Sequence, residues 1–287
     1  MNRLSTQRRA QVIGLLCEGM AMRAVSRTTG VARQTISDLL GEIGQAASEY
    51  QDHAFRNLNC KVVEADEIWS FVGSKRKNVP AGHEDDADYG DVWTWTAIDA
   101  DTKLVPSWLV GERTMADCYT FLADLKSRLK NARIQLTTDG LGHYLRCVDG
   151  IWVDNIDFAM LHKIYGSGGE NTPERTYSPA VCTGIEIRII AGDPNPDRIS
   201  TSYVERQNLT MRMGMRRFTR LTNAFSKKVE FHAHAVSLYF LYYNFAKYHA
   251  SLRIKNADGT FTQRTPAMAA GVATYKWSVE QIAGLLD

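Results

Sequence analysis

Apolar side chains in residues 1–45 recur at helical spacing and predict three short helices. The first is expected over residues 6–18, the second over 22–29, and the third from residue 33 to about 43. Gly30 lies between the second and the third, where a tight turn requires a positive φ that glycine adopts freely. The pattern therefore predicts a small all-α domain that contains a helix-turn-helix.

The start of the third expected helix carries polar side chains suited to nucleic acid. In a helix-turn-helix, this end of the recognition helix meets base edges and phosphates. Val31, Ile36 and Leu39 are apolar and would hold the helix against the core. The polar residues that remain outward are Arg33, Gln34, Thr35 and Ser37. An ordinary helical hairpin can share this spacing, so a purely structural role stays open.

After a polar linker at 46–60, the pattern changes to short apolar runs typical of strands. Three strands come first, and helix, strand, helix, strand and helix follow. This order is that of the ribonuclease H-like fold, an α/β mixed sheet with helices on both faces. We expect this domain at 61–250, with an insertion around 147–199, and a C-terminal tail at 251–287. The expected strands are 61–73, 92–100, 104–110, 133–140, 157–165 and 184–190, and the expected helices are 114–130, 141–147, 201–217 and 226–248.

Charge is distributed unevenly along the chain. The net charge is only +2, yet residues 205–255 contain ten Lys and Arg against two Glu, a local charge of +8. Such a concentration suits a polyanionic partner. A solvated helix face is the alternative, but Leu209 and Met213 among the cations favour a helix with one side on the core and the other on phosphate. The candidates for DNA contact in this region are Arg206, Arg212, Arg216, Arg217, Lys227 and Lys228.

Composition argues against several other classes of protein. No apolar run approaches the ~20 residues that span a bilayer, and the N-terminus lacks the pattern of a secretory signal. We therefore expect a cytoplasmic protein with no membrane partner. The five cysteines are scattered without a C-x-x-C pair, which argues against a disulfide frame or a cysteine-rich zinc site.

Three acidic residues stand where a metal centre would require them. Asp66 lies inside an apolar strand, Asp139 ends the fourth expected strand, and Glu205 is early in the basic helix. A carboxylate inside a strand is costly unless it is used or paired. The first and fourth strands are neighbours in the expected fold, so Asp66 and Asp139 can meet there. For Glu205, a surface ion pair is the alternative.

Carboxylates from separate elements suit Mg²⁺, with Mn²⁺ as a substitute. Two such ions stabilise both the attacking and the leaving oxygen of a phosphodiester that is being cleaved. By strand alternation, Glu64 shares the face of Asp66 and is the rival ligand, whereas Glu67 points to the opposite face.

Three segments strongly resemble the DDE transposases of the family named after insertion sequence one. They are DEIWSFVG (66–73), TTDG (137–140) and ERQNLTMRMGMRRFTRLTNAFSKK (205–228). The resemblance covers about residues 60–250. It implies a ribonuclease H-like catalytic domain, Mg²⁺ dependence and transfer of the element's 3′-hydroxyl ends into target DNA. By this match, Asp66, Asp139 and Glu205 are the catalytic triad.

The resemblance also suggests two auxiliary residues and shows two departures. Arg212, on the same helix face as Glu205, matches a basic residue that would grip the terminal phosphate or base, and His232 matches a histidine after the SKK block. The best-known family members begin with a cysteine-rich zinc finger, which this chain lacks. The 66 positions between Asp139 and Glu205 also exceed the family's usual spacing, and the expected insertion accounts for them.

The function expected from this match is cleavage and joining of DNA at the ends of an insertion sequence. Its partners would be double-stranded DNA, as terminal repeats and target, and further copies of the chain, with a prokaryotic, nucleoid-associated location. One alternative is a transposase-derived DNA-binding regulator without catalysis, which the intact triad disfavours. Another is a different nuclease of this fold, such as a junction resolvase, which the helix-turn-helix and the 205–228 block disfavour.

Overall fold

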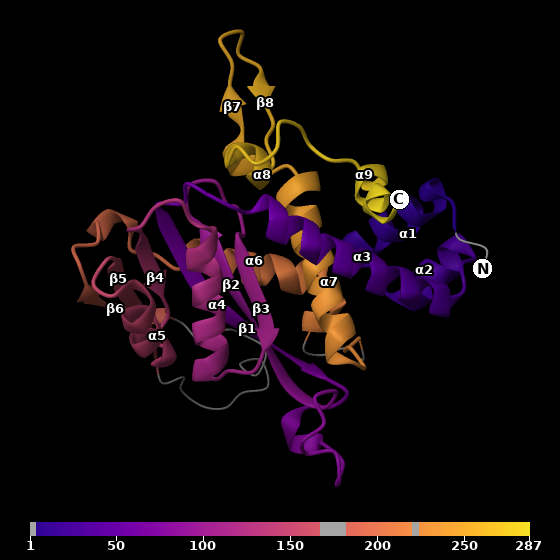
Figure 1. The fold of residues 1–287 in the computed structure, drawn as a ribbon, viewed down its shortest axis with the longest axis horizontal. Coiled ribbons are helices and arrows are strands. Elements are labelled where there is room, and N and C mark those ends of the chain that lie inside the picture. Colours follow the sequence, from indigo (N-terminus) through magenta and orange to yellow (C-terminus); the bar gives the residue numbers. More distant parts are fainter. Residues whose placement is uncertain (1–3, 167–181, 220–223) are drawn as a thin grey trace.

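A mixed sheet occupies the centre of the molecule. The computed structural model describes residues 4–166, 182–219 and 224–287. The described residues form a six-stranded sheet of order β3-β2-β1-β4-β5-β6 (Figure 1). The strands are β1 (Val62–Val72), β2 (Gly90–Asp99), β3 (Ser107–Gly111), β4 (Gln135–Thr138), β5 (Asp157–Tyr165) and β6 (Cys182–Ala191). β2 runs antiparallel to both of its neighbours, β1 and β3, whereas β4 and β5 run parallel to β1, and β6 is antiparallel to β5. The expected mixed α/β sheet is confirmed.

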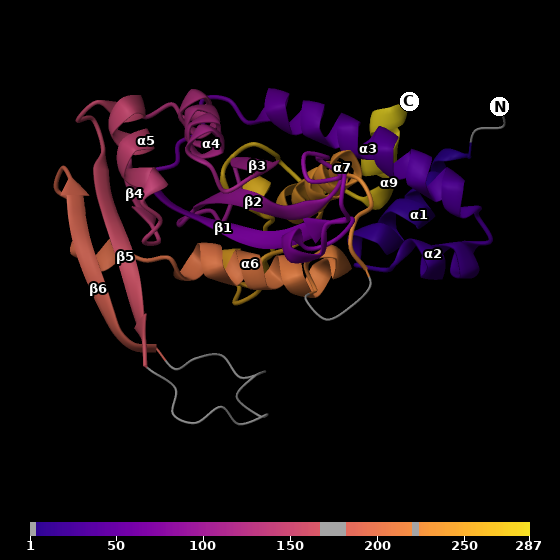
Figure 2. The same ribbon diagram turned by 90° about the horizontal axis from the view of Figure 1, so that it is seen from below.

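Helices cover both faces of this sheet. Figure 2 shows α4 (Met115–Arg128) and α5 (His143–Trp152) on one side of the sheet and α6 (Ser202–Gly214) on the other. The Thr114 hydroxyl accepts a hydrogen bond from the Asp117 N–H and starts α4 at the expected residue. The expectation of helices on both faces is therefore confirmed.

The N-terminal region consists of α1 (Thr6–Cys17), α2 (Met22–Thr29) and α3 (Arg33–Ala54). Gly30, between α2 and α3, has a φ of 71°, as the turn requires. The expected end of the third helix near residue 43 is wrong, because α3 continues to Ala54 and takes up most of the expected linker. The reason is packing of α3 against α7 (Val229–Leu241), where the Gln51 side chain donates to the carbonyl of Ser237 at 3.1 Å.

The C-terminal region returns to the N-terminal helices. After α7 come a π-helical turn at Tyr242–Ala246, a hairpin of β7 (Ile254–Lys255) and β8 (Phe261–Thr262), α8 (Pro266–Ala269) and α9 (Val279–Ala283). The hairpin projects from the body, whereas α9 packs beside α1 (Figure 1). Arg9 forms an ion pair with Asp287. Short 3-10 helices are Arg76–Asn78, Pro196–Arg198, Arg216–Phe218, Ala250–Leu252 and Gly284–Leu286.

The expected insertion at 147–199 needs correction. Most of α5 and all of β5 lie within it, and both belong to the central domain, since β5 pairs in parallel with β4 from Gln135↔Asp157 onward. Only β6 is added at the sheet edge, and residues 167–181 lie outside the described part of the chain. The long spacing between Asp139 and Glu205 thus contains regular structure. Within the described ranges, no helix has the length and apolar character to cross a membrane.

Candidate metal centre

Asp66 and Asp139 meet at the end of β4. The parallel pairing of β1 with β4 ends at Ala65↔Thr138, so each aspartate is the first residue beyond the paired segment. The carboxylates of Asp66, Glu67 and Asp139 each place an oxygen within 4.8 Å of the others. Two of the three predicted triad residues are therefore neighbours, as the strand order required.

Among the residues that the structure describes, the groups that donate hydrogen bonds to Asp66 are neutral. The Glu67 N–H donates to its Oδ1 at 2.8 Å, and the Asn208 amide on α6 donates to its Oδ2 at 2.8 Å. Burial, and then the nearby charges of Asp139 and Glu205, raise the pKa of Asp66 to about 7. Asp139 accepts the Leu141 N–H at 3.0 Å. A cation here would relieve the repulsion between these acids, so the donor set fits a hard divalent metal.

Glu67 lies on the opposite sheet face but still reaches this cluster. It is buried, and its carboxylate accepts from Arg113 Nε at 2.7 Å and from the Tyr144 hydroxyl at 3.4 Å. Burial, followed by the charges of Asp139 and Asp66, raises the pKa of Glu67 to about 7 although Arg113 opposes the shift. The predicted face is thus confirmed, but the expectation that its orientation removes Glu67 from the centre is wrong.

Glu64, predicted as the rival ligand, is held elsewhere by α6. Its carboxylate accepts the backbone N–H groups of Tyr203 and Val204 at 2.7 and 3.0 Å. These are N–H groups of the first helical turn, which need a partner from outside the helix. Glu64 shares the α6 side of the sheet with Asp66, as predicted, and anchors the helix that carries Glu205 and Asn208.

Glu205 lies outside this cluster and forms an ion pair. Its carboxylate is bound by Lys163 of β5, at 2.5 Å to Oε1, and by the Thr201 hydroxyl at 2.8 Å. It is not among the carboxylates that lie within 4.8 Å of one another. The surface ion pair weighed as an alternative for Glu205 is therefore present, and it lies next to the predicted centre.

Two residues of the site were missed from the sequence. Asn208 follows Glu205 by three positions, which puts both on one helix face, so helical spacing was an available signal. Lys163 is a cation inside the apolar strand DFAMLHKIY, where a charged side chain needs a partner.

The residues predicted to contact DNA from α3 are accessible. Arg33, Gln34 and Thr35 are exposed at its start, and Ser37 is half-buried. Gln34 donates to Asp38 one turn later at 2.7 Å, and the side chains of Arg33 and Thr35 are exposed to solvent. Their role in binding DNA stays a prediction.

The basic residues near α6 fall into two groups. Arg206, Arg216, Lys227 and Lys228 are exposed, and Arg212 is half-buried. Arg217 instead turns inward: it donates to the Ser226 hydroxyl at 2.5 Å, and burial lowers its pKa to about 10. Its geometry is that of a structural cation, whereas the other five remain candidates for phosphate contact.

His232 is fully buried in the core. Its Nδ1 lies 3.1 Å from the Ser226 hydroxyl, and its ring packs against Phe218. Burial, and then the charge of Arg217, lower its pKa to about 3, so the ring is neutral near pH 7. Because it is buried, the ring cannot contact DNA directly, and an auxiliary role for His232 stays a prediction.

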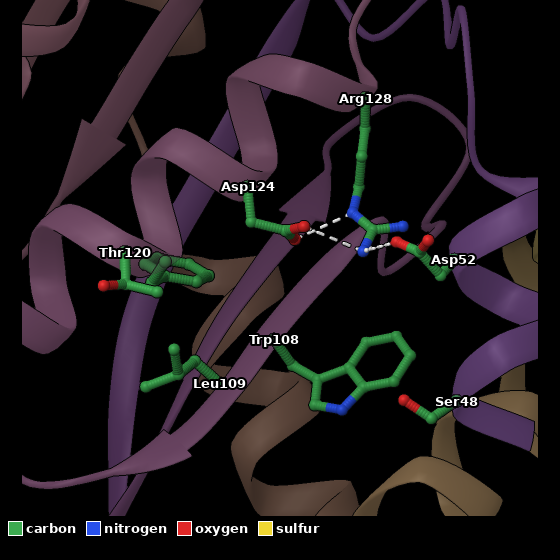
Figure 3. A pocket seen from close by; sticks show the side chains of 8 residues that line it. Ser48, Asp52, Trp108, Leu109, Thr120, Asp124 and Arg128 are labelled. Atoms are coloured by element: carbon green, nitrogen blue, oxygen red, sulfur yellow. Dashed lines mark hydrogen bonds and ion pairs between the residues drawn. The ribbon is translucent and has the colours of Figure 1, made fainter. Parts of the chain in front are cut away.

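A cleft of about 290 Å³ lies between α3, β3 and α4 (Figure 3), and its lining does not include Asp66, Glu67 or Asp139. Arg128 in its wall donates to Asp124 at 2.7 Å and to Asp52 at 2.9 Å. The Arg128 guanidinium is thus paired with carboxylates in the cleft, and the cleft contains none of the predicted site residues.

Comparison with known proteins finds a similar protein from an insertion element. No family model matches it. Over 178 residues it is 26% identical to the insertion element iso-IS1n protein InsB of Shigella dysenteriae, which covers 62% of this chain and 92% of that protein. This similarity agrees with the resemblance found in the three sequence segments.

Matches to solved structures are loose. A Mos1 transposase paired-end complex with left transposon end covers 55% of this chain and 60% of its own, at 14% identity and a TM-score of 0.23. A pre-cleavage Mos1 transpososome covers 84% of this chain and 78% of its own, at 11% identity and a TM-score of 0.28. TM-scores this low support no argument about this chain.

Proposed function

We propose that this chain is a DDE transposase that binds the ends of an insertion sequence and catalyses metal-dependent DNA cleavage and strand transfer. The observation that carries the proposal is the meeting of Asp66 and Asp139 at the end of β4, with α6 alongside them. The strand order, three antiparallel strands followed by two parallel ones, supports a ribonuclease H-like catalytic domain. The similarity to an insertion-element protein supports the substrate.

Asp66 and Asp139 would hold the metal, Mg²⁺ or Mn²⁺, with Glu205 as the third ligand. When bound, the metal would supply charge that stabilises the attacking and leaving oxygens of the phosphodiester. Asn208 orients the Asp66 carboxylate, and Glu64 fixes the start of α6. Lys163 holds Glu205 in its present position and would have to release it for the triad to assemble.

Glu67 has a supporting place in this proposal. Its carboxylate lies beside both aspartates, but Arg113 already neutralises much of its charge. We infer that Glu67 positions the cluster and adds negative potential toward the metal. Its bonds to Arg113 and Tyr144 tie the cluster to the start of α4 and to α5.

DNA binding would involve two regions of the chain. The helix-turn-helix of α2 and α3 would read the terminal repeats through Arg33, Gln34, Thr35 and Ser37. Arg206, Arg212, Arg216, Lys227 and Lys228 would contact phosphates near the catalytic carboxylates. Several copies of the chain would act together, because two ends of the element must be joined.

The test is cleavage and joining of labelled duplexes that carry the element's ends. Wild type is compared with Asp139→Asn, and with Asp149→Asn, an exposed aspartate on α5, as the matched control. We expect wild type and the control to cut and join with Mg²⁺ or Mn²⁺, and Asp139→Asn to bind DNA without doing either. Binding by all three proteins, with cleavage by none, would replace the proposal with a DNA-binding regulator.

A further inference from the structure

We propose that the outer edge of β6 pairs with β6 of a second copy of this chain, antiparallel and centred on Ile187. This interface does not depend on the proposed catalytic function. Among the described residues, β6 is the last strand of the sheet, and its outer edge pairs with no other strand. Figure 2 shows β6 outermost, beyond β5. Such an edge presents unpaired backbone N–H and C=O groups that can template a further strand.

The side chains of β6 are unusually apolar for a solvent-facing strand. Ile185, Ile187 and Ile189 are 58%, 49% and 57% exposed. Alternation puts these three on one face, where they lie opposite Lys163, Leu161 and Ala159 of β5. Isolated apolar side chains on a surface are ordinary, but a continuous stripe on an open strand edge indicates a partner. If a second copy extended the sheet, its isoleucines would pack beside this stripe and bury the flank that now faces solvent.

Charge complementarity favours a second copy as that partner, and it also favours one register. Glu186 and Arg188 lie on the other face of β6, both exposed, with Arg188 Nε 2.8 Å from Glu186 Oε1. In antiparallel pairing centred on Ile187, Glu186 of each copy stands opposite Arg188 of the other. The four charges then alternate in sign, whereas a shift of the centre to 186 or 188 places like charges opposite each other.

The same register completes the apolar face. Ile187 meets its own counterpart on the two-fold axis, and Ile185 of each copy meets Ile189 of the other. Six isoleucines then form one stripe across the junction of two sheets. Because the contact is isologous, the association stops at a dimer and does not grow into a filament.

The experiment measures the oligomeric state of the full chain by analytical ultracentrifugation over a range of concentrations. We expect a reversible dimer for wild type. Ile187→Lys puts two ammonium groups opposite each other and should raise the dimer dissociation constant by about tenfold or more. Ile254→Lys on β7 is the matched control, because Ile254 is 46% exposed and β7 lies far from β6 (Figure 1), and it should leave the constant unchanged.

A charge exchange tests the register itself. Glu186→Arg and Arg188→Glu should each be monomeric alone, since each places like charges opposite one another. Mixed in equal amounts they should form a heterodimer, because each then supplies the charge that the other lacks. A wild-type monomer at high concentration, equal weakening by Ile254→Lys, or no heterodimer on mixing would overturn the proposal. The edge would then be free for another occupant, such as a different protein or another segment of this chain.

Discussion

Asp66→Asn should make the metal-free protein more stable at neutral and alkaline pH. The substitution removes one of three carboxylates that lie within 4.8 Å of one another and keeps the shape of the side chain. The Glu67 N–H can still donate to the new amide oxygen. Asn208 can rotate its amide so that Oδ1, which is buried without a hydrogen-bond partner, accepts from the new amide nitrogen. The hydrogen bonds therefore survive while the repulsion is removed.

The magnitude follows from the pKa. An aspartate whose pKa rises from 3.8 to about 7 in the folded state carries a penalty of up to about 4 kcal/mol when ionised. Asp66 keeps partial access to solvent and its neighbours can relax, so we expect roughly half of this, about 2 kcal/mol, to be recovered. For a chain of this size the gain corresponds to a rise of about 4–8 °C in Tm.

The sign of the pH dependence is fixed by the same shift. Below pH 3.8 the carboxyl is protonated in both the folded and the unfolded protein, so it makes no difference to stability. Between pH 3.8 and about 7 the unfolded chain ionises first, and the penalty on the folded state grows as the pH rises. The advantage of Asp66→Asn should therefore be small near pH 4 and complete near pH 8.

The assay is thermal unfolding followed by circular dichroism, with chelator and then with Mg²⁺ or Mn²⁺. Added metal should raise the Tm of wild type and leave that of Asp66→Asn nearly unchanged, so the difference between them shrinks or reverses. Asp149→Asn is the exposed control and should follow wild type. If Asp66→Asn melts below wild type near pH 8 in chelator, or gains equally at both pH values, the assignment of mutual repulsion at this cluster is refuted.

Two further predictions concern the packing of α3 and the ion pair at Glu205. Gly44→Ala should destabilise the protein by about 1–3 kcal/mol in urea unfolding, because its Cβ would lie 2.7 Å from a backbone carbonyl oxygen of α7. Gly41→Ala, one turn earlier and 3.6 Å from a ring carbon, should be neutral or stabilising, and equal losses at both would contradict the close approach of α3 and α7. Lys163→Met should strengthen metal binding about two- to fivefold in calorimetry, since it frees Glu205 and removes a competing cation; weaker binding would show that Lys163 supports the centre.

The fold was largely predictable where local pattern and tertiary structure agree. β1 alternates and contains Asp66, and Thr114 is a helix cap followed by a helical pattern, so both elements were found close to their observed bounds. The extension of α3 beyond residue 43 was not predictable in this way. It is stabilised by contact with α7, almost 200 positions away, and the local polar residues carry no sign of it.

The candidate site was likewise predictable only where the local sequence pattern determines it. Alternation along β1 assigned the faces of Glu64 and Glu67 correctly, but their roles depended on neighbours from distant segments. Glu64 accepts hydrogen bonds from the start of α6, whereas Glu67 lies close to Asp139, just beyond the end of β4. Which of the two flanking acids joins the cluster therefore depends on neighbouring elements, and the sequence of β1 alone does not identify them.

The position of α6 links these observations into one structural argument. The helix is held at its start by Glu64 and near its middle by the bond from Asn208 to Asp66, both from β1. Glu205 lies between these two attachments, so the helix backbone cannot shift far without breaking one of them. Assembly of the triad would therefore require side-chain rotation of Glu205 away from Lys163. β5 carries Lys163 and pairs with β6. A partner bound to the outer edge of β6 would therefore lie one strand away from the residue that holds Glu205.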